Sequence, residues 1–556
     1  MTVHDAWSFA QLEDFWRCYE PLTPWGRDEV GRRAVFNDAA TINHRHDDIA
    51  AAIGWLEAAA QDVVGLDRVS YHLKRLPRLP LVPKDEYEQL ELFQFKKFLA
   101  NYRGLLQRLP AAVAAGFGLV PAGRELATAL DMGGSDAETF FLADAYHPDL
   151  AALRSDLRGL DDELLASLEH QTGLVEREFG LVFAGREFLV ADRQLLPDPL
   201  SLAAHCSVEP YDDAAYLVRL LPNAARLALA TRRESLLAAE QATENEVLRR
   251  LSGLVVDALP ALCSAVQAVT RFDLARAGAV LAGRFALVRP DFDAATAVRV
   301  RDGRFLPCQL ECQRLGLAYQ PLSTEFGAPA VVLFGSNMGG KTVVLKSLLF
   351  FQLLAQAGLY VPAAAFQTRV FDHIEYVGEL AGERLAGLSG FGFEIWRFQR
   401  VWPLRNALIA FDELARTTGS HEAEALLSAI VEAYARPLPA SPRLANPRPA
   451  MPTDLVAKLP ADRTLALFTT HFRGVARLPA ALYLRMEGLD HQAACLSDDG
   501  GRLEERLAGI NRHMRYRLVA DQPERSDSSD ALAIAAMLGL DCALVERAQA
   551  YFQSQP

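Results

Sequence analysis

Residues 335–342 read Gly-Ser-Asn-Met-Gly-Gly-Lys-Thr, and this spacing of glycines ahead of a lysine and a hydroxyl is typical of a phosphate-binding loop. An apolar run at 331–334 precedes the loop and an apolar stretch at 343–357 follows it, which is the strand–loop–helix order that the motif requires. Lys341 would reach the terminal phosphates and the Thr342 hydroxyl would ligate Mg²⁺, while glycine N–H groups surround phosphate oxygens. The pattern therefore predicts nucleoside triphosphate binding, with ATP and Mg²⁺ as cofactors, by Gly335, Ser336, Asn337, Met338, Gly339, Gly340, Lys341 and Thr342.

A second apolar run, at 408–411, ends in the acids Asp412 and Glu413. Many buried strands end in such a pair, but about 70 residues after a phosphate loop it indicates the other half of a nucleotide site. Asp412 would hold Mg²⁺ through water, and Glu413 would polarise the attacking water. A glutamate in that place favours a hydrolase over a kinase, because it activates water instead of orienting a second substrate.

A third apolar run, at 465–468, leads through Thr469 and Thr470 to His471. An imidazole at that strand end could contact the γ-phosphate and report its presence. A histidine alone at a strand end is more often structural, and only the other two motifs make a functional role the better interpretation.

The elements that must position these residues follow from the spacing of apolar side chains. Up to about residue 300 the spacing is mostly helical, at 47–63, 85–107 and 161–179, with a hairpin expected at 181–190 that turns near Gly185. A long helix is expected over 211–256, interrupted near its start by Pro222. Later, strands are expected at 330–334, 407–411, 464–469 and 481–486, with helices beginning near Lys341, Gly392 and His421.

The fold class that we predict is therefore multidomain, with a mostly α-helical domain followed by an α/β P-loop ATPase domain and a short helical C-terminal segment. The helical domain would span 1–300 with a small β insertion at about 180–206, the ATPase domain 301–525, and the terminal segment 526–556. The proline-rich stretch 437–460 is interpreted as a surface insertion.

Composition narrows the class of protein. The chain has 556 residues, a formal net charge of −13 and seven cysteines without the paired spacing of a zinc site. Neither a secretory signal nor a membrane span is expected, so the prediction is a cytoplasmic protein with reduced thiols and no membrane partner. The acidic balance lowers the expectation of strong non-specific DNA binding, because phosphate neutralisation supplies most of that affinity.

Together the motifs resemble the MutS family of ABC-type ATPases. Residues 335–342 are close to that family's Gly-Pro-Asn-Met-Gly-Gly-Lys-Ser, and Asp-Glu-Leu-Ala-Arg-Thr-Thr at 412–418 stands where the family has Asp-Glu-Ile-Gly-Arg-Gly-Thr. Thr-His-Phe at 470–472 is similar to the end of Ala-Thr-His-Tyr, and 387–394 to the family's Gly-Arg-Ser-Thr-Phe-Met-Val-Glu signature. The resemblance is specific over about 320–550, where it implies an ATPase domain of ABC type. It covers the helical half only in pattern, and there it implies a core and lever domain.

The resemblance implies a homodimer in which Ser389, at a helix N-terminus, reaches the γ-phosphate bound by the other subunit. Glu413, His471 and Ser389 would then be the catalytic residues, and Thr342 and Asp412 the metal ligands. This sequence departs from the pattern at Ser336, which replaces the loop proline, and at two glycines near the start of the signature helix.

The client on which such a dimer acts is left open by the sequence. By family default it is duplex or branched DNA, in repair or recombination, but we expect no N-terminal mismatch-reading domain and a shortened clamp at about 180–206. The alternative is a protein client, because 342–346 and 414–418 look similar to a MutS-like subfamily proposed as the reactivase ATPase for the cobalamin-dependent lysine 5,6-aminomutase. A nucleotide-binding regulator without turnover is a third possibility, against which Glu413 argues.

Overall fold

The computed structural model describes residues 4–134, 140–194, 196–292, 297–335, 339–379, 389–435, 464–490, 510, 512–521 and 530–554. The chain divides into two compact units, of which unit 1 combines Met1–Val63 with Thr270–Pro556 and unit 2 is Val64–Val269. Helices and mixed sheets are both present, which confirms the coarse expectation of a helical and α/β multidomain protein. The predicted functional domains, 1–300, 301–525 and 526–556, stay a prediction, because packing alone defines the two units.

A six-stranded sheet forms the centre of unit 1, in the order β13-β12-β7-β11-β10-β9. Only β13 is antiparallel to its neighbour. The strand β7 is buried along its whole length, and its Ala-Val-Val-Leu-Phe sequence suits a parallel strand that is covered on both faces. The strands are β7 (Ala330–Phe334), β9 (His373–Val377), β10 (Ala407–Asp412), β11 (Leu465–Thr470), β12 (Ala481–Leu489) and β13 (Met514–Ala520).

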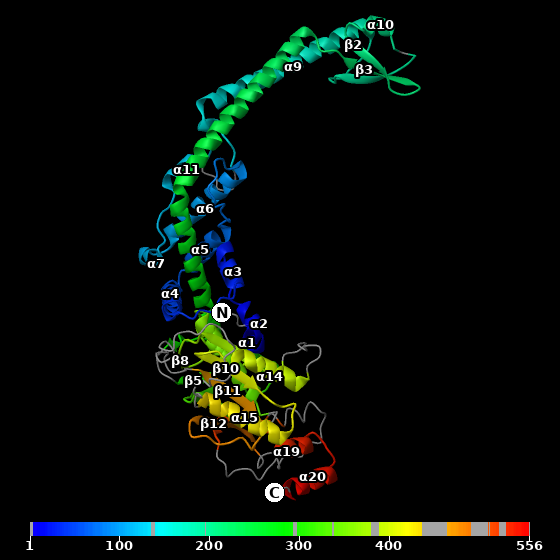
Figure 1. The fold of residues 1–556 in the computed structure, drawn as a ribbon. Coiled ribbons are helices and arrows are strands. Elements are labelled where there is room, and N and C mark those ends of the chain that lie inside the picture. Colours follow the sequence, from blue (N-terminus) through cyan, green and yellow to red (C-terminus); the bar gives the residue numbers. More distant parts are fainter. Residues whose placement is uncertain are drawn as a thin grey trace, which may run out of the picture. The chain divides into compact units, whose positions relative to one another are not determined.

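Three helices alternate with these strands, as the sequence predicts. They are α13 (Lys341–Gln356), α14 (Gly390–Val401) and α15 (Ser420–Ala435), and α14 and α15 lie beside the sheet in Figure 1. The helix α13 contains neither glycine nor proline, and most of its side chains are buried, so packing rather than amphipathic exposure stabilises it.

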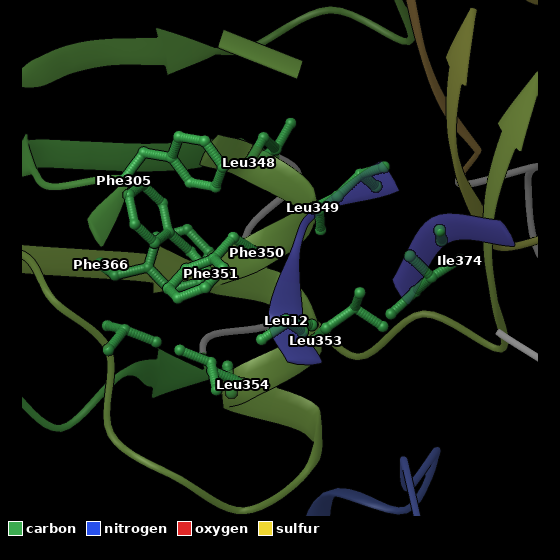
Figure 2. Packing of buried hydrophobic residues seen from close by; sticks show 14 of the residues in the cluster. Leu12, Phe305, Leu348, Leu349, Phe350, Phe351, Leu353, Leu354, Phe366 and Ile374 are labelled. Carbon is green, nitrogen blue, oxygen red and sulfur yellow. The ribbon is translucent and has the colours of Figure 1, made fainter. Parts of the chain in front are cut away.

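The main core of unit 1 joins segments from both ends of the sequence. Figure 2 shows Leu12 of α2 (Leu12–Trp16) in the same cluster as Phe350 and Leu353 of α13 and Phe305 near α12. The N-terminal helices thus complete the hydrophobic cover of α13 and belong to unit 1. The remaining helices of this unit are α1 (His4–Phe9), α3 (Pro24–Gly31), α4 (Ala39–Ala58), α12 (Leu306–Arg314), α19 (Asp530–Met537) and α20 (Cys542–Ser554).

A smaller four-stranded sheet, which the sequence did not predict, flanks the same core in the order β4-β8-β5-β6. Phe366 of β8 and Phe326 of β6 belong to the main core, so this sheet covers part of α13. Its strands are β4 (Asp291–Phe292), β5 (Val298–Gly303), β6 (Leu322–Phe326) and β8 (Ala365–Thr368).

Unit 2 is built on two antiparallel helices. Arg154 of α9 (Pro148–Phe179) pairs with Glu240 and Glu244 of α11 (Ala224–Phe285), and Arg233 of α11 pairs with Asp161. The helix α11 passes from unit 2 into unit 1 at residue 270. Unit 2 also holds α5 (Val63–Arg75), α6 (Gln89–Arg108), α7 (Ala111–Gly116), α8 (Arg124–Leu130), η1 (Asp144–Tyr146) and α10 (Pro199–Leu202).

A three-stranded antiparallel sheet, in the order β1-β3-β2, joins α9 to α11. Its strands are β1 (Phe188–Asp192), β2 (Cys206–Pro210) and β3 (Ala215–Leu220), and Figure 1 shows β2 and β3 next to α10. A β element was expected here, but the prediction of a tight hairpin at 181–190 is wrong. Only Phe188 onwards is a strand, and it pairs with β3 instead of with residues before Gly185.

The predicted helix over 211–256 is also corrected. Residues 215–220 form β3, and the helix begins at Ala224, two residues after Pro222. It continues through Pro260 to Phe285. Among the described helices α11 alone is long and apolar enough to cross a membrane by length and composition, a criterion that a buried core helix also meets. The cytoplasmic location stays a prediction.

Candidate nucleotide-binding site

The site is set by where three neighbouring parallel strands end. The register aligns Phe334 of β7 with Thr470 of β11, and Asp412 of β10 with Thr469. Gly335, the end of β10 and His471 therefore lie at one edge of the sheet, the edge where open α/β sheets bind ligands. Three motifs that are far apart in the sequence meet there.

Two glycines of the loop adopt backbone conformations that other residues reach only with strain. Gly335 has φ 153° and Gly340, the residue before α13, has φ 88°. A Cβ at Gly340 would also lie 3.3 Å from Cδ1 of Tyr516. The described part of the loop thus needs its glycines, whereas Ser336, Asn337 and Met338 lie outside the described residues.

Lys341 lies at the N-terminus of α13 and is almost completely buried. Its Nζ donates a hydrogen bond of 2.5 Å to the carbonyl oxygen of Gly335 and lies 3.8 Å from Oε1 of Glu413. Burial lowers the pKa of Lys341, and the carboxylates of Glu413 and Asp412 oppose that shift. The cation is therefore folded back onto the loop and the acidic pair, at the place where the motif expects phosphate.

Asp412 joins the loop helix to β11 through two hydroxyls. Thr342 Oγ1 lies 3.2 Å from both carboxylate oxygens, and Thr469 Oγ1 donates to Oδ1 at 2.6 Å. Desolvation raises the pKa of Asp412, while the two hydroxyl hydrogen bonds lower it. The predicted metal residues Thr342 and Asp412 are thus in contact.

These two residues supply a carboxylate and a hydroxyl, which are the hard oxygen ligands that Mg²⁺ prefers. The described residues contain no group of three or more His, Cys, Asp or Glu that could hold a metal ion alone. A site with two protein oxygens fits Mg²⁺ that takes its other ligands from phosphate and water.

Glu413 has a left-handed backbone, with φ 52°. Its N–H donates to Thr469 Oγ1 at 3.0 Å, so one threonine orients both acids of the pair. Arg416 lies 3.5 Å from Oε2 of Glu413 and 2.5 Å from the Glu379 carboxylate. A residue in this strained region persists only where its surroundings hold it, and such positions gather at functional sites.

Ser389 precedes α14, and its Oγ accepts a hydrogen bond of 3.1 Å from the N–H of Gly392. Its side chain caps its own helix and is exposed to solvent. Glu394 of the same helix accepts from the N–H of Ala415 at 2.7 Å and lies 3.3 Å from Thr417 Oγ1. The signature helix is therefore tied to the loop that follows the acidic pair, while nothing described links Ser389 to Lys341 of its own chain.

His471 follows β11 with its ring exposed, 4.3 Å from the ring of Phe472. Within the described residues it makes no hydrogen bond or ion pair. His471 thus lies at the same edge of the sheet as the acidic pair, without a described contact to it. The catalytic roles of His471 and Ser389 stay predictions.

Sequence reasoning missed the residues that support the acidic pair. Thr469 and Glu379 carry no motif signal, because their role depends on which strands are neighbours. Arg416 and Glu394 stand inside the quoted motifs, yet their partners are visible only in the fold.

Part of the chain is similar to known proteins. Residues 331–445 match the family model of MutS domain V. The chain is similar to the DNA mismatch repair protein MutS of Streptococcus gordonii, with 29% identity over 265 residues, which are 46% of this chain and 27% of that protein. It is also similar to MutS of Bacillus licheniformis, with 29% identity over 195 residues, 34% of this chain and 22% of that protein.

The protein named DNA mismatch repair protein HexA in Streptococcus pneumoniae is 28% identical over 193 residues, 34% of this chain and 23% of that protein. The matched segments thus span about a quarter of the length of these relatives. The matches support membership of the MutS family.

Proposed function

We propose that this protein is a MutS-type ATPase that binds and hydrolyses Mg²⁺-ATP at composite sites of a homodimer. One observation carries the proposal: Lys341, Thr342, Asp412 and Glu413 converge at the edge of the sheet. The match of 331–445 to MutS domain V supports it.

The roles follow from the contacts. When ATP enters, Lys341 exchanges its contacts with the Gly335 carbonyl and the Glu413 carboxylate for phosphate oxygens. This exchange releases Glu413 from its ion pair with Lys341. Thr342 and Asp412 would hold Mg²⁺, which would supply neutralisation of the phosphate charge. Glu413 polarises the attacking water, and Arg416 with Thr469 holds that carboxylate and its backbone in place.

The composite character of the site rests on Ser389. Ser389 and Gly390, at the N-terminus of α14, are exposed, so the partial positive charge of this helix end is open to solvent, and Ser389 has no described partner at the phosphate site of its own chain. A second copy would bring this helix end to the γ-phosphate and complete the electrostatic stabilisation of the transition state.

We infer the client on which the ATPase cycle acts from the similar proteins, which are named as DNA mismatch repair proteins. We infer duplex or branched DNA, on which ATP-driven closing moves the helical arms. The second candidate is a protein client, as in a reactivase for the cobalamin-dependent lysine 5,6-aminomutase, and the net charge of −13 favours it.

The deciding experiment measures the ATPase rate with and without duplex or branched DNA across a salt series. Stimulation that fades steeply with salt supports DNA, and a flat response supports the protein client. Lys341→Ala must abolish ATP binding while the protein stays folded, as shown by its thermal unfolding. ATP affinity like that of the wild type in this variant would refute the site itself.

A further inference from the structure

The three-stranded sheet of unit 2 lies in a module, residues 181–221, whose sheet has one buried face and one exposed face. One face packs on the module's own core, where Ala191, Val218 and Leu220 meet Val175 of α9 and Phe183. Antiparallel sheets of this kind normally present polar residues on the other face. Along β1, exposed residues alternate with residues that face the core.

The outer face carries exposed apolar side chains. Phe188 and Val190 alternate with the core residues of β1, and their side chains are 51% and 50% exposed. Val190 is paired with Leu217 of β3, so three apolar side chains lie together on two neighbouring strands. A cross-strand apolar cluster on the solvent side contributes less to stability than a buried one and indicates an interaction surface.

Two acidic groups and one arginine border this cluster. Register places Asp192 on the outer face of β1, Glu209 of β2 next to Leu217, and Arg219 of β3 next to Phe188. The module 181–221 contains three arginines, no lysine and six Asp or Glu, which makes it net acidic. Of the arginines, Arg193 lies over the Tyr216 ring at 4.8 Å.

We propose that this outer face docks a partner protein through a segment that carries two or three apolar side chains flanked by lysine or arginine. The module carries six acids against three arginines, and this net charge disfavours nucleic acid, whose binding needs Lys and Arg contacts to phosphate. The net charge also opposes face-to-face pairing with a second copy, because both modules would carry the same sign. The inference does not depend on the ATPase assignment.

The test uses the full chain and a labelled synthetic amphipathic helix with a leucine stripe flanked by lysines. A twin peptide with glutamates in place of the lysines controls for simple hydrophobic adhesion. Fluorescence anisotropy should show binding of the lysine peptide, and the glutamate twin should bind at least about tenfold more weakly. No binding of the lysine peptide to the wild-type chain would overturn the proposal.

Matched variants locate the surface. Val190→Thr and Phe188→Ser should each weaken the lysine peptide by about tenfold or more, because anchors at the centre of an interface carry most of its affinity. Val120→Thr, at another exposed valine of unit 2 (58% exposed), should leave it unchanged. Equal losses in Val190→Thr and Val120→Thr would overturn the assignment.

Two further outcomes would also overturn it. Binding of labelled duplex DNA that is lost in both Val190→Thr and Phe188→Ser would make the face a nucleic-acid site, and self-association that disappears in Phe188→Ser would make it a contact between copies. ATP turnover should be unchanged in these variants, so failure here is distinguishable from failure of the proposed function.

Discussion

Thr469 is the residue whose change tests the site most directly. It is buried, donates to Asp412 Oδ1 at 2.6 Å and accepts from the N–H of Glu413 at 3.0 Å. Thr469→Val keeps the β-branched shape that suits β11 but removes both hydrogen bonds. If the acidic pair works as proposed, this one oxygen orients the Mg²⁺ ligand and the catalytic glutamate together.

The expected loss follows from the bonds removed. A hydrogen bond to a charged group contributes about 1.5–3 kcal/mol, and about 1.4 kcal/mol corresponds to a factor of ten. We therefore expect kcat/KM for Mg²⁺-ATP to fall by about 10- to 100-fold. The Thr469 hydroxyl also lowers the pKa of Asp412 against the effect of burial, so its loss moves the acidic limb of the pH–rate profile to higher pH.

The assay is phosphate release as a function of Mg²⁺ concentration and pH, with thermal unfolding as the measure of stability. Thr470→Val is the control, because Thr470 is its equally buried neighbour and accepts a hydrogen bond of 3.0 Å from the N–H of Phe472. Both variants should lose similar stability, but only Thr469→Val should need more Mg²⁺. Equal kinetic losses in the two variants would refute the reasoning.

Three other changes have defined outcomes. Glu413→Gln should slow phosphate release by about 100-fold or more while ATP stays bound to a persistent dimer, and unchanged release would remove Glu413 from its role. A mixture of Ser389→Ala and Lys341→Ala should recover activity, because one composite site per heterodimer stays intact; no recovery would contradict the shared site. Burial raises the pKa of Glu375 to about 7, so stability present below pH 4.5 is lost as pH rises through 7. The free energy of unfolding of Glu375→Gln at pH 8 should therefore exceed that of the wild type by about 1–3 kcal/mol, and this gain, measured by denaturant unfolding, should shrink towards pH 4.5.

The strand–loop–helix around the phosphate loop could be predicted because each part is encoded locally. The run 331–334 is apolar without interruption, and the predicted helix start at Lys341 is confirmed by α13. The strand at 407–411 and its acidic end are local in the same sense, and β10 confirms them.

Errors arose where pairing is not local. The tight hairpin at 181–190 was inferred from two adjacent runs around Gly185, but β1 pairs with β3, which begins at Ala215. Alternation shows that a segment can be a strand without showing its partner. The end of the long helix was predicted near residue 256, whereas α11 continues through Pro260 to Phe285. Buried side chains beyond the proline, such as Leu262 and Phe272, pack this part of the helix against the rest of the protein.

The same limit explains why the catalytic acids could be named and their supports could not. Asp412 and Thr469 are Cα partners in the parallel register of β10 and β11, although 57 positions separate them in the sequence. A shift of that register by one residue would turn the Thr469 side chain to the opposite face of the sheet and bring Thr470 to the site. The orientation of the acidic pair is therefore a property of strand register, which hydrophobic packing on both faces of β11 determines.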